Sequence, residues 1–164
     1  MSHVAVQKIS PGEASPIADI QALTDQIRLR AYELFQSRGG GAGSALDDWL
    51  MAEDDIVLTP ESDLVESDDK FELQIAVPGF DANDIDVSAM PDALIVRADN
   101  AHHHESTEGD VCFCEFGNKS LYRRFDLPAP IDVDKVTTNL QKGILKVTAT
   151  KEEKTARKSS SVAA

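Results

Sequence analysis

The residues best suited to chemistry in this 164-residue chain lie between His102 and Cys114. Three consecutive histidines, His102, His103 and His104, precede Cys112 and Cys114, and imidazole and thiolate groups are ligands for zinc or copper. Consecutive histidines point in diverging directions, however, and neither a Cys-x2-Cys pair nor a helical histidine spacing is present. We therefore predict a solvated loop here, with no metal site and no cofactor. A metal-handling or redox-sensing protein centred on this cluster stays as an alternative.

Motifs for catalysis are missing from the sequence. No serine lies in a Gly-x-Ser-x-Gly turn, and the glycines at 39–43 are not followed by the Lys-Ser or Lys-Thr pair of a phosphate-binding loop. The many carboxylates lie in acidic surface runs. We expect neither an enzyme nor an ATP-driven machine.

The net charge of −13 is concentrated in the middle of the chain. Residues 59–128 carry 5 basic and 16 acidic side chains, whereas residues 129–164 carry 7 basic and 4 acidic ones. Such an acidic body repels phosphate, so neither nucleic acid nor a membrane is an expected partner. No apolar run reaches the roughly 20 residues that cross a bilayer, and the N-terminus lacks a secretory signal. With two cysteines too close along one strand to pair comfortably, we expect a cytoplasmic protein.

Residues 1–58 are predicted to form an N-terminal helical arm. The first twelve end in Ser10-Pro11-Gly12 and are expected to be flexible. Apolar residues then recur every three or four positions from about Pro16 to Ser37, which predicts an amphipathic helix that the glycines at 39–41 end. Ser44 can cap a short second helix through about Glu53, with its apolar residues on one side. The apolar residues are Ile17, Ile20, Leu23, Ile27, Ala31 and Leu34 in the first helix, and Leu46, Trp49 and Leu50 in the second.

From Pro60 onward the hydrophobic period changes to two. Seven short strands are predicted, at residues 64–66, 71–75, 85–89, 94–96, 121–127, 136–140 and 145–150. Strands without intervening helices predict an all-β fold, an antiparallel immunoglobulin-like β-sandwich in residues 59–151. Residues 99–116 are longer than an ordinary hairpin loop, and within them Val111, Phe113 and Phe116 alternate like a strand. Residues 152–164 are expected to be a short disordered tail.

Three motifs of the second half are distinctive in their order and spacing. They are Ala76-Val77-Pro78-Gly79-Phe80, Arg123-Arg124-Phe125-Asp126-Leu127-Pro128 and Leu140-Gln141-Lys142-Gly143-Ile144-Leu145-Lys146-Val147. Together they resemble the α-crystallin domain of small heat-shock proteins of the bacterial type, over about residues 60–151. In the last motif Gly143, Ile144 and Leu145 match, but Thr138 stands where the family has an alanine. Residues 27–53 also resemble a small bacterial helical module that is fused to such chaperones.

The resemblance implies a homodimer that can build higher oligomers. In bacterial and plant members the long loop carries a strand that pairs with the partner subunit, which assigns Val111, Phe113 and Phe116 to the dimer interface. Arg123 would pair there with carboxylates, for which a guanidinium is well suited; the alternative is a surface charge that balances the acidic body. The helical stripe must find another surface, either on other subunits or on an unfolding client. The residues assigned to these contacts are Ile20, Leu23, Ile27, Leu34, Trp49 and Leu50.

Family members usually end with an Ile-x-Ile or Ile-x-Val motif that fills a groove of a neighbouring subunit, and nothing after Lys151 matches it. The resemblance assigns that groove to Ile85, Val87, Val136 and Leu140. Val4-Ala5-Val6 and Ile56-Val57-Leu58 are candidate substitutes, and we take Val4 and Val6 as the latch candidate, which heat or clients would displace. Burying two branched side chains offsets about 3–6 kcal/mol before ordering costs, which suits a reversible latch. Without the usual motif, we expect dimers or small assemblies.

We therefore predict an ATP-independent holdase chaperone. Exposed apolar surfaces of the helices and the groove would bind partly unfolded client proteins, and the acidic exterior would keep the complex dissolved. The alternative from another class is an assembly or scaffold module that docks one folded partner. Relatives of that kind usually lack the long amphipathic region and the paired-strand loop that are present here.

Overall fold

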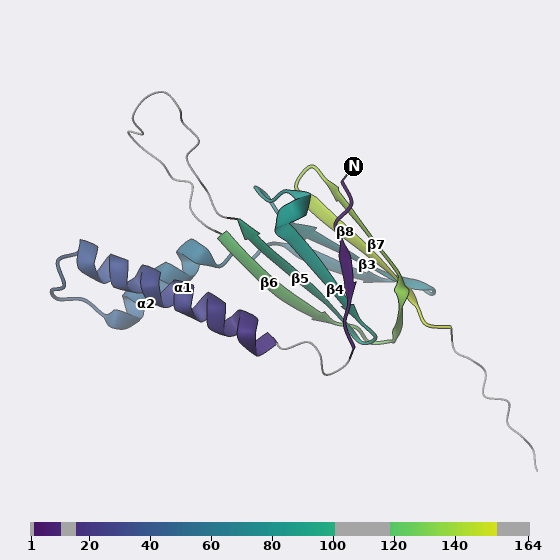
Figure 1. Cartoon of the computed structure of the whole chain (residues 1–164), viewed down its shortest axis with the longest axis horizontal. Helices are drawn as coiled ribbons and strands as arrows, with labels where there is room; N and C mark the ends of the chain where they lie inside the picture. Colours follow the sequence, from purple (N-terminus) through teal and green to yellow (C-terminus); the bar gives the residue numbers. More distant parts are fainter. Residues whose placement is uncertain (1, 11–15, 101–118, 154–164) are drawn as a thin grey trace, which may run out of the picture.

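The computed structural model describes residues 2–10, 16–100 and 119–153 of the chain. Its strands form two four-stranded sheets, with strand orders β1-β4-β5-β6 and β2-β3-β8-β7 (Figure 1). The strands are β1 (Val6–Lys8), β2 (Ser62–Glu66), β3 (Lys70–Ala76), β4 (Ile85–Met90), β5 (Ala93–Asn100), β6 (Lys119–Asp126), β7 (Ile131–Gln141) and β8 (Ile144–Lys151). The helices are α1 (Pro16–Ser37), α2 (Ala45–Ile56) and the short 3-10 helix η1 (Ala82–Asp84). All seven predicted strands are present, and the predicted β-sandwich with a helical N-terminal region is confirmed.

The sandwich closes because alternate residues of its strands are apolar. In β3, Phe71, Leu73 and Ile75 point inward and are fully buried, whereas the residues between them are more exposed. β8 pairs with β3 in the antiparallel sense and adds Leu145 and Val147 to the same core. This period-two pattern makes one face of each sheet apolar, and the two apolar faces bury each other.

Two tight turns set the course of the chain at the edges of the sandwich. Lys142 and Gly143 have φ values of 53° and 73°, the left-handed conformation at both central positions that a two-residue hairpin between β7 and β8 requires. After β3, Pro78 supplies a fixed φ and Gly79 has a φ of 82°, which suits a type II turn closed from Phe80 to Val77. Both turns lie in the motifs that carried the family resemblance.

Residues 2–10 are more ordered than the sequence predicted. Residues 1–12 were expected to be flexible, but Val6–Lys8 form a strand that pairs in parallel with residues 87–89 of β4 and extends that sheet. The N-terminal region is therefore not only helical (Figure 1). Turn signals such as Ser10-Pro11-Gly12 carry no information about a strand edge that is distant in sequence.

The two predicted helices are confirmed, and they fold back on each other as a hairpin beside β6 (Figure 1). The Ser44 side chain caps α2 by accepting a hydrogen bond from the Leu46 N–H at 3.2 Å. α2 continues to Ile56, one turn beyond its predicted end near Glu53. Within the described ranges, neither helix is long and apolar enough to cross a membrane.

Candidate functional site

The predicted groove residues lie together where β4 of one sheet faces β7 of the other. Ile85 and Val87 of β4 are buried, and Val136 and Leu140 of β7 are half-buried against the same apolar cluster. They meet because alternate residues of both strands point into the sandwich. This edge of the molecule is therefore an apolar surface bounded by two strands of different sheets.

The N-terminal segment, residues 2–9, lies along this surface. Val4 is only 4% exposed and belongs to the main core, and Val6 packs against the same cluster from the next inward position. Val6 is aligned with Val87 of β4, while at the other end the Ser2 peptide exchanges two hydrogen bonds with Leu140 of β7, of 3.3 and 2.9 Å. The segment thus contacts both sheets, as Figure 1 shows for β1 beside β4. Both latch candidates face the groove residues within one chain; their role as a latch stays a prediction.

The second candidate substitute, Ile56-Val57-Leu58, lies elsewhere. Ile56 ends α2 and is buried between the helices, and Val57 forms a bridge with Ser120 of β6. The Leu58 N–H donates to the Ser120 carbonyl oxygen at 3.0 Å. Because β1 and β6 are the two outer strands of this sheet, the segment covers the edge opposite the groove.

One polar side chain interrupts the apolar row of β7. Thr138 lies between the inward-facing Val136 and Leu140 and is 5% exposed. Its hydroxyl accepts a hydrogen bond from the Val4 N–H at 3.0 Å and donates one to the Val4 carbonyl oxygen at 2.6 Å. We did not assign this residue to the site from sequence. The signal was its departure from the alanine of the family pattern.

The apolar stripe of α1 has a partner within the chain, which the sequence did not lead us to expect. Ile27 is 6% exposed and packs against Ala52 and Ile56 of α2, and further apolar side chains surround this cluster. These are Leu23, Ala31, Leu34, Trp49 and Val57. Among the assigned contact residues, Leu23, Ile27, Leu34 and Trp49 are therefore engaged between the helices, because the glycine turn brings α2 back onto the stripe.

The predicted apolar side of α2 was partly wrong. Leu46, Trp49 and Leu50 were expected to share one side, but the buried residues of the helix are Asp48, Ala52 and Ile56. Trp49 borders this side, whereas Leu46 and Leu50 are exposed. The stripe of α1 selects the face of α2 that it covers, and α2 alone carries too few apolar residues to define that face by periodicity.

An ion pair holds the turn between the two helices. The Arg38 guanidinium lies 2.7 Å from Asp48 Oδ2 and donates a second hydrogen bond to Oδ1 at 3.0 Å. It also donates to the carbonyl oxygens of Gly41 and Ala42 at 2.7 and 3.1 Å. The hydrogen bonds from Arg38 hold the pKa of the Asp48 carboxyl below its ordinary value. One guanidinium therefore fixes both the loop and the start of α2.

The outer surface of the helical hairpin is rich in large apolar side chains. The exposed ones on α1 and α2 are Ile20, Leu29, Tyr32, Phe35, Leu46, Leu50 and Met51. Two of them, Tyr32 and Phe35, stack with ring centroids 6.3 Å apart. Ile20 and Leu50 are the assigned contact residues that stay accessible. Several exposed apolar side chains on one helical hairpin indicate a surface for protein–protein contact.

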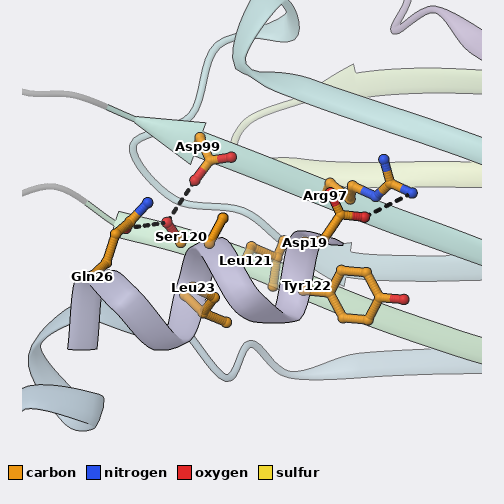
Figure 2. A pocket seen from close by; sticks show the side chains of 9 residues that line it. Asp19, Leu23, Gln26, Arg97, Asp99, Ser120, Leu121 and Tyr122 are labelled. Atoms are coloured by element: carbon orange, nitrogen blue, oxygen red, sulfur yellow. Dashed lines mark hydrogen bonds and ion pairs between the residues drawn. The ribbon is translucent and has the colours of Figure 1, made fainter. Parts of the chain in front are cut away.

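Polar groups join α1 to the sandwich across β5 and β6 (Figure 2). Asp19 of α1 lies 3.1 Å from the Arg97 guanidinium, and the Ser120 hydroxyl lies 3.3 Å from Gln26 Oε1 and donates to Asp99 Oδ1 at 2.5 Å. These groups line a small open hollow between the helix and the sheet. Because they bond to one another, we interpret the seam as the attachment of the helical hairpin to the domain.

Arg123 and Arg124 point to opposite sides of β6, as expected for neighbours on a strand. Arg123 is half-buried: its Nη2 donates to Ser62 Oγ at 3.4 Å, and its guanidinium lies over the Phe125 ring at 5.2 Å. Arg124 forms an ion pair with Asp126 at 2.8 Å. The role of Arg123 in a dimer interface stays a prediction.

The other assigned residues of the long loop lie outside the described part of the chain. These are Val111, Phe113 and Phe116 of the predicted dimer interface, and His102, His103, His104, Cys112 and Cys114 of the metal alternative. Among the residues that the structure does describe, no three His, Cys, Asp or Glu side chains are grouped so that they could hold a metal ion.

Comparison with known families decides the identity of the fold. A model of the Hsp20/alpha crystallin family matches residues 63–163. The chain belongs to this family. This confirms the resemblance inferred from the three motifs, and because family members are small heat-shock chaperones, the expectation that the chain is not an enzyme is also confirmed. A second model, of a family described as a protein of unknown function (DUF2934), matches residues 22–56, which comprise most of the helical hairpin.

Individual Hsp20 relatives cover the sandwich part of the chain. Heat shock protein 16 of Schizosaccharomyces pombe is 32% identical over 103 residues, which is 62% of this chain and 72% of that protein. Small heat shock protein C2 of Rickettsia felis is 28% identical over 96 residues, 58% of this chain and 62% of that protein. The solved structure of heat shock protein 16.0 from S. pombe aligns with 59% of this chain and with 90% of its own chain, with a TM-score of 0.51 and 31% sequence identity. These similarities support a chaperone role.

Proposed function

We propose that this protein is an ATP-independent holdase of the cytoplasm, which binds partly unfolded proteins and suppresses their aggregation. The observation that carries the proposal is the match of residues 63–163 to the Hsp20 family, whose members act on unfolded clients and form oligomers. Holding requires no turnover: binding of an unfolded species lowers the free concentration that can aggregate. Capture is therefore stoichiometric.

The exposed apolar side chains of the helical hairpin are the client surface in this proposal. They are the large apolar side chains that the cluster around Ile27 leaves exposed, and Ile20 and Leu50 are the members that were also assigned from sequence. Partly unfolded chains expose apolar side chains of their own, so contact buries surface on both partners. The net charge of −13 favours solubility of the loaded complex.

We further propose that the working unit is a homodimer, from which higher oligomers can form. The strand-like tract with Val111, Phe113 and Phe116 would pair with the partner subunit, and Arg123 would meet partner carboxylates at that interface. Support comes from the position of Arg123 at the outer strand of its sheet, half-buried and without an ion pair among the described residues. A guanidinium in such a position can accept a carboxylate from a second chain.

Light scattering of a heat-labile test enzyme measures the proposed activity. In stoichiometric amounts and without nucleotide, the protein is expected to suppress the scattering, and size-exclusion chromatography is expected to show a soluble complex. Leu50→Ser removes an exposed apolar side chain from α2 and should weaken protection about twofold, since apolar surface drives the contact. Glu53→Ser, at another exposed position of the same helix, is the matched control and should leave protection unchanged.

The outcomes separate the alternatives. No suppression at any ratio would refute the holdase, and binding of one folded partner only would favour the scaffold function. Loss of protection in a Cys112→Ser, Cys114→Ser variant would favour the metal or redox alternative. Equal effects of Leu50→Ser and Glu53→Ser would exclude the α2 surface as the client site while leaving holdase activity intact.

A further inference from the structure

The contact between Thr138 and the N-terminal segment is unusual for an apolar groove. The hydroxyl bonds to both the N–H and the carbonyl oxygen of one residue, Val4, at 3.0 and 2.6 Å. The Thr138 carbonyl oxygen lies 3.0 Å from His3 Nδ1, which donates to it. Two consecutive residues of the segment are therefore bonded to a single residue of β7.

These bonds fix the segment along its length. Because the N–H and carbonyl of one strand residue point to the same side, the hydroxyl can bond to both only when Val4 lies directly opposite it. In this position the Val4 side chain enters the core, and Val6 follows at the next inward position. A shift by one residue would turn Val4 and Val6 outward and bring Ala5 and Gln7 inward. The polar and apolar contacts therefore select the same alignment.

We propose that Thr138 is a positioning residue, which fixes the alignment of the chain's own N-terminal segment, residues 2–9, in the β4–β7 groove of the same chain. An alanine at this place could not bond to the backbone of the segment. The buried hydroxyl disfavours any alignment that leaves it unpaired. The proposal concerns the docked segment alone, so it holds or fails independently of client capture.

The connection to α1 supports docking within one chain. At its far end the segment is held by the bond from the Ile9 N–H to the Ala89 carbonyl oxygen, of 3.1 Å, and by an ion pair between Lys8 and Asp134. α1 is attached to the same sheet through Asp19 and Arg97. Only residues 11–15 join Ser10 to α1, and five residues span at most about 18 Å. So short a connection favours docking of the segment and the helix on one sandwich.

Hydrogen exchange of the full-length protein tests the proposal with two substitutions at one position. Thr138→Val keeps the size and branching of the side chain and removes the hydroxyl, so exchange of the N-terminal peptide should rise about thirtyfold, as for two ordinary hydrogen bonds lost. Thr138→Ser keeps the hydroxyl and should restore exchange to within about threefold of the unchanged protein. Peptides from β3 and β8 report on the fold and should exchange at the same rate in all three proteins.

Each contrary result overturns the proposal. Unchanged exchange in Thr138→Val would show that the hydroxyl does not hold the segment, and equally raised exchange in the serine and valine variants would show that the hydroxyl alone is not sufficient to hold it. Faster exchange of β3 and β8 together with the N-terminus would reveal a general structural role. Protection that falls when the protein is diluted a hundredfold would show that the segment comes from a second copy of the chain.

Discussion

Ile27→Ala should unfold the helical hairpin and leave the sandwich intact. Ile27 is 6% exposed at the centre of the cluster between α1 and α2. The substitution removes three carbon atoms, worth roughly 0.8 kcal/mol each, and leaves a cavity that the helices can only partly close. We therefore expect a loss of about 2–4 kcal/mol in the free energy of unfolding of the hairpin. A unit of two helices has a small free energy of unfolding, so such a loss is sufficient to unfold it.

The single tryptophan of the chain makes this measurable. Trp49 lies on α2 beside the cluster, so its fluorescence reports on the hairpin, whereas far-UV circular dichroism of the β-structure reports on the sandwich. With a urea dependence of about 1 kcal/mol per M for a small unit, the Trp49 midpoint should fall by about 2 M or more, or vanish. The circular dichroism transition of the sandwich should keep its midpoint.

Leu29→Ala is the matched control, because it removes the same number of carbons from the same helix at a position that is 62% exposed. It should change the free energy of unfolding by less than about 0.5 kcal/mol. The reasoning fails if the two substitutions shift the Trp49 midpoint equally. It also fails if Ile27→Ala lowers the fluorescence and circular dichroism midpoints together, since the hairpin would then be inseparable from the sandwich.

Three further predictions concern the groove, the ion pair and the hairpin turn. Val4→Asp places a charge in the buried part of the segment, so it should release residues 2–9 and increase the binding of an apolar dye to the groove. Ala5→Asp, on the exposed side of the same segment, should leave dye binding unchanged. Equal dye binding by both variants would contradict the docking. The lowered pKa of Asp48 means that its pairing with Arg38 stabilises the hairpin above about pH 4 and that this contribution is lost as the pH falls through the lowered pKa. Asp48→Asn should remove this acid dependence from Trp49 unfolding curves recorded between pH 6 and 2, and an unchanged dependence would assign it to other carboxyls. Gly143→Ala should destabilise the sandwich by about 1–2 kcal/mol in urea unfolding, because the φ of 73° is unfavourable for a residue with a side chain although no atom clashes there. Gly41 has open space around it and its φ is not left-handed, so Gly41→Ala should have little effect.

Most of the secondary structure could be predicted because its causes are local. Period-two alternation marked seven of the eight described strands, all except β1, and Ser44 and the glycine turn marked the ends of the helices. The groove residues could be assigned because Ile85, Val87, Val136 and Leu140 lie on recognisable strands of the family pattern. Each of these signals spans only a few residues, so a single sequence contains them completely.

The partners of these elements could not be predicted in the same way. The stripe of α1 indicated only that some surface covers it, and α2 was not recognised as that surface because two short amphipathic helices pack according to their three-dimensional arrangement. In the sequence, Thr138 was recognisable only as a threonine in place of the alanine of the family pattern. Its function as a bonding partner depends on Val4, which lies 134 residues away along the chain.

The sequence by itself determined the strands, the helices, the family and the apolar character of the groove, since these follow from residue types at short spacing. Only the tertiary structure decided that residues 2–9 lie in the groove, that Ile56-Val57-Leu58 lies at the opposite edge, and that the two helices cover each other. Each of these outcomes is a choice between competing apolar surfaces. Such a choice depends on which surfaces come into contact in the folded chain, and a local sequence pattern does not determine it.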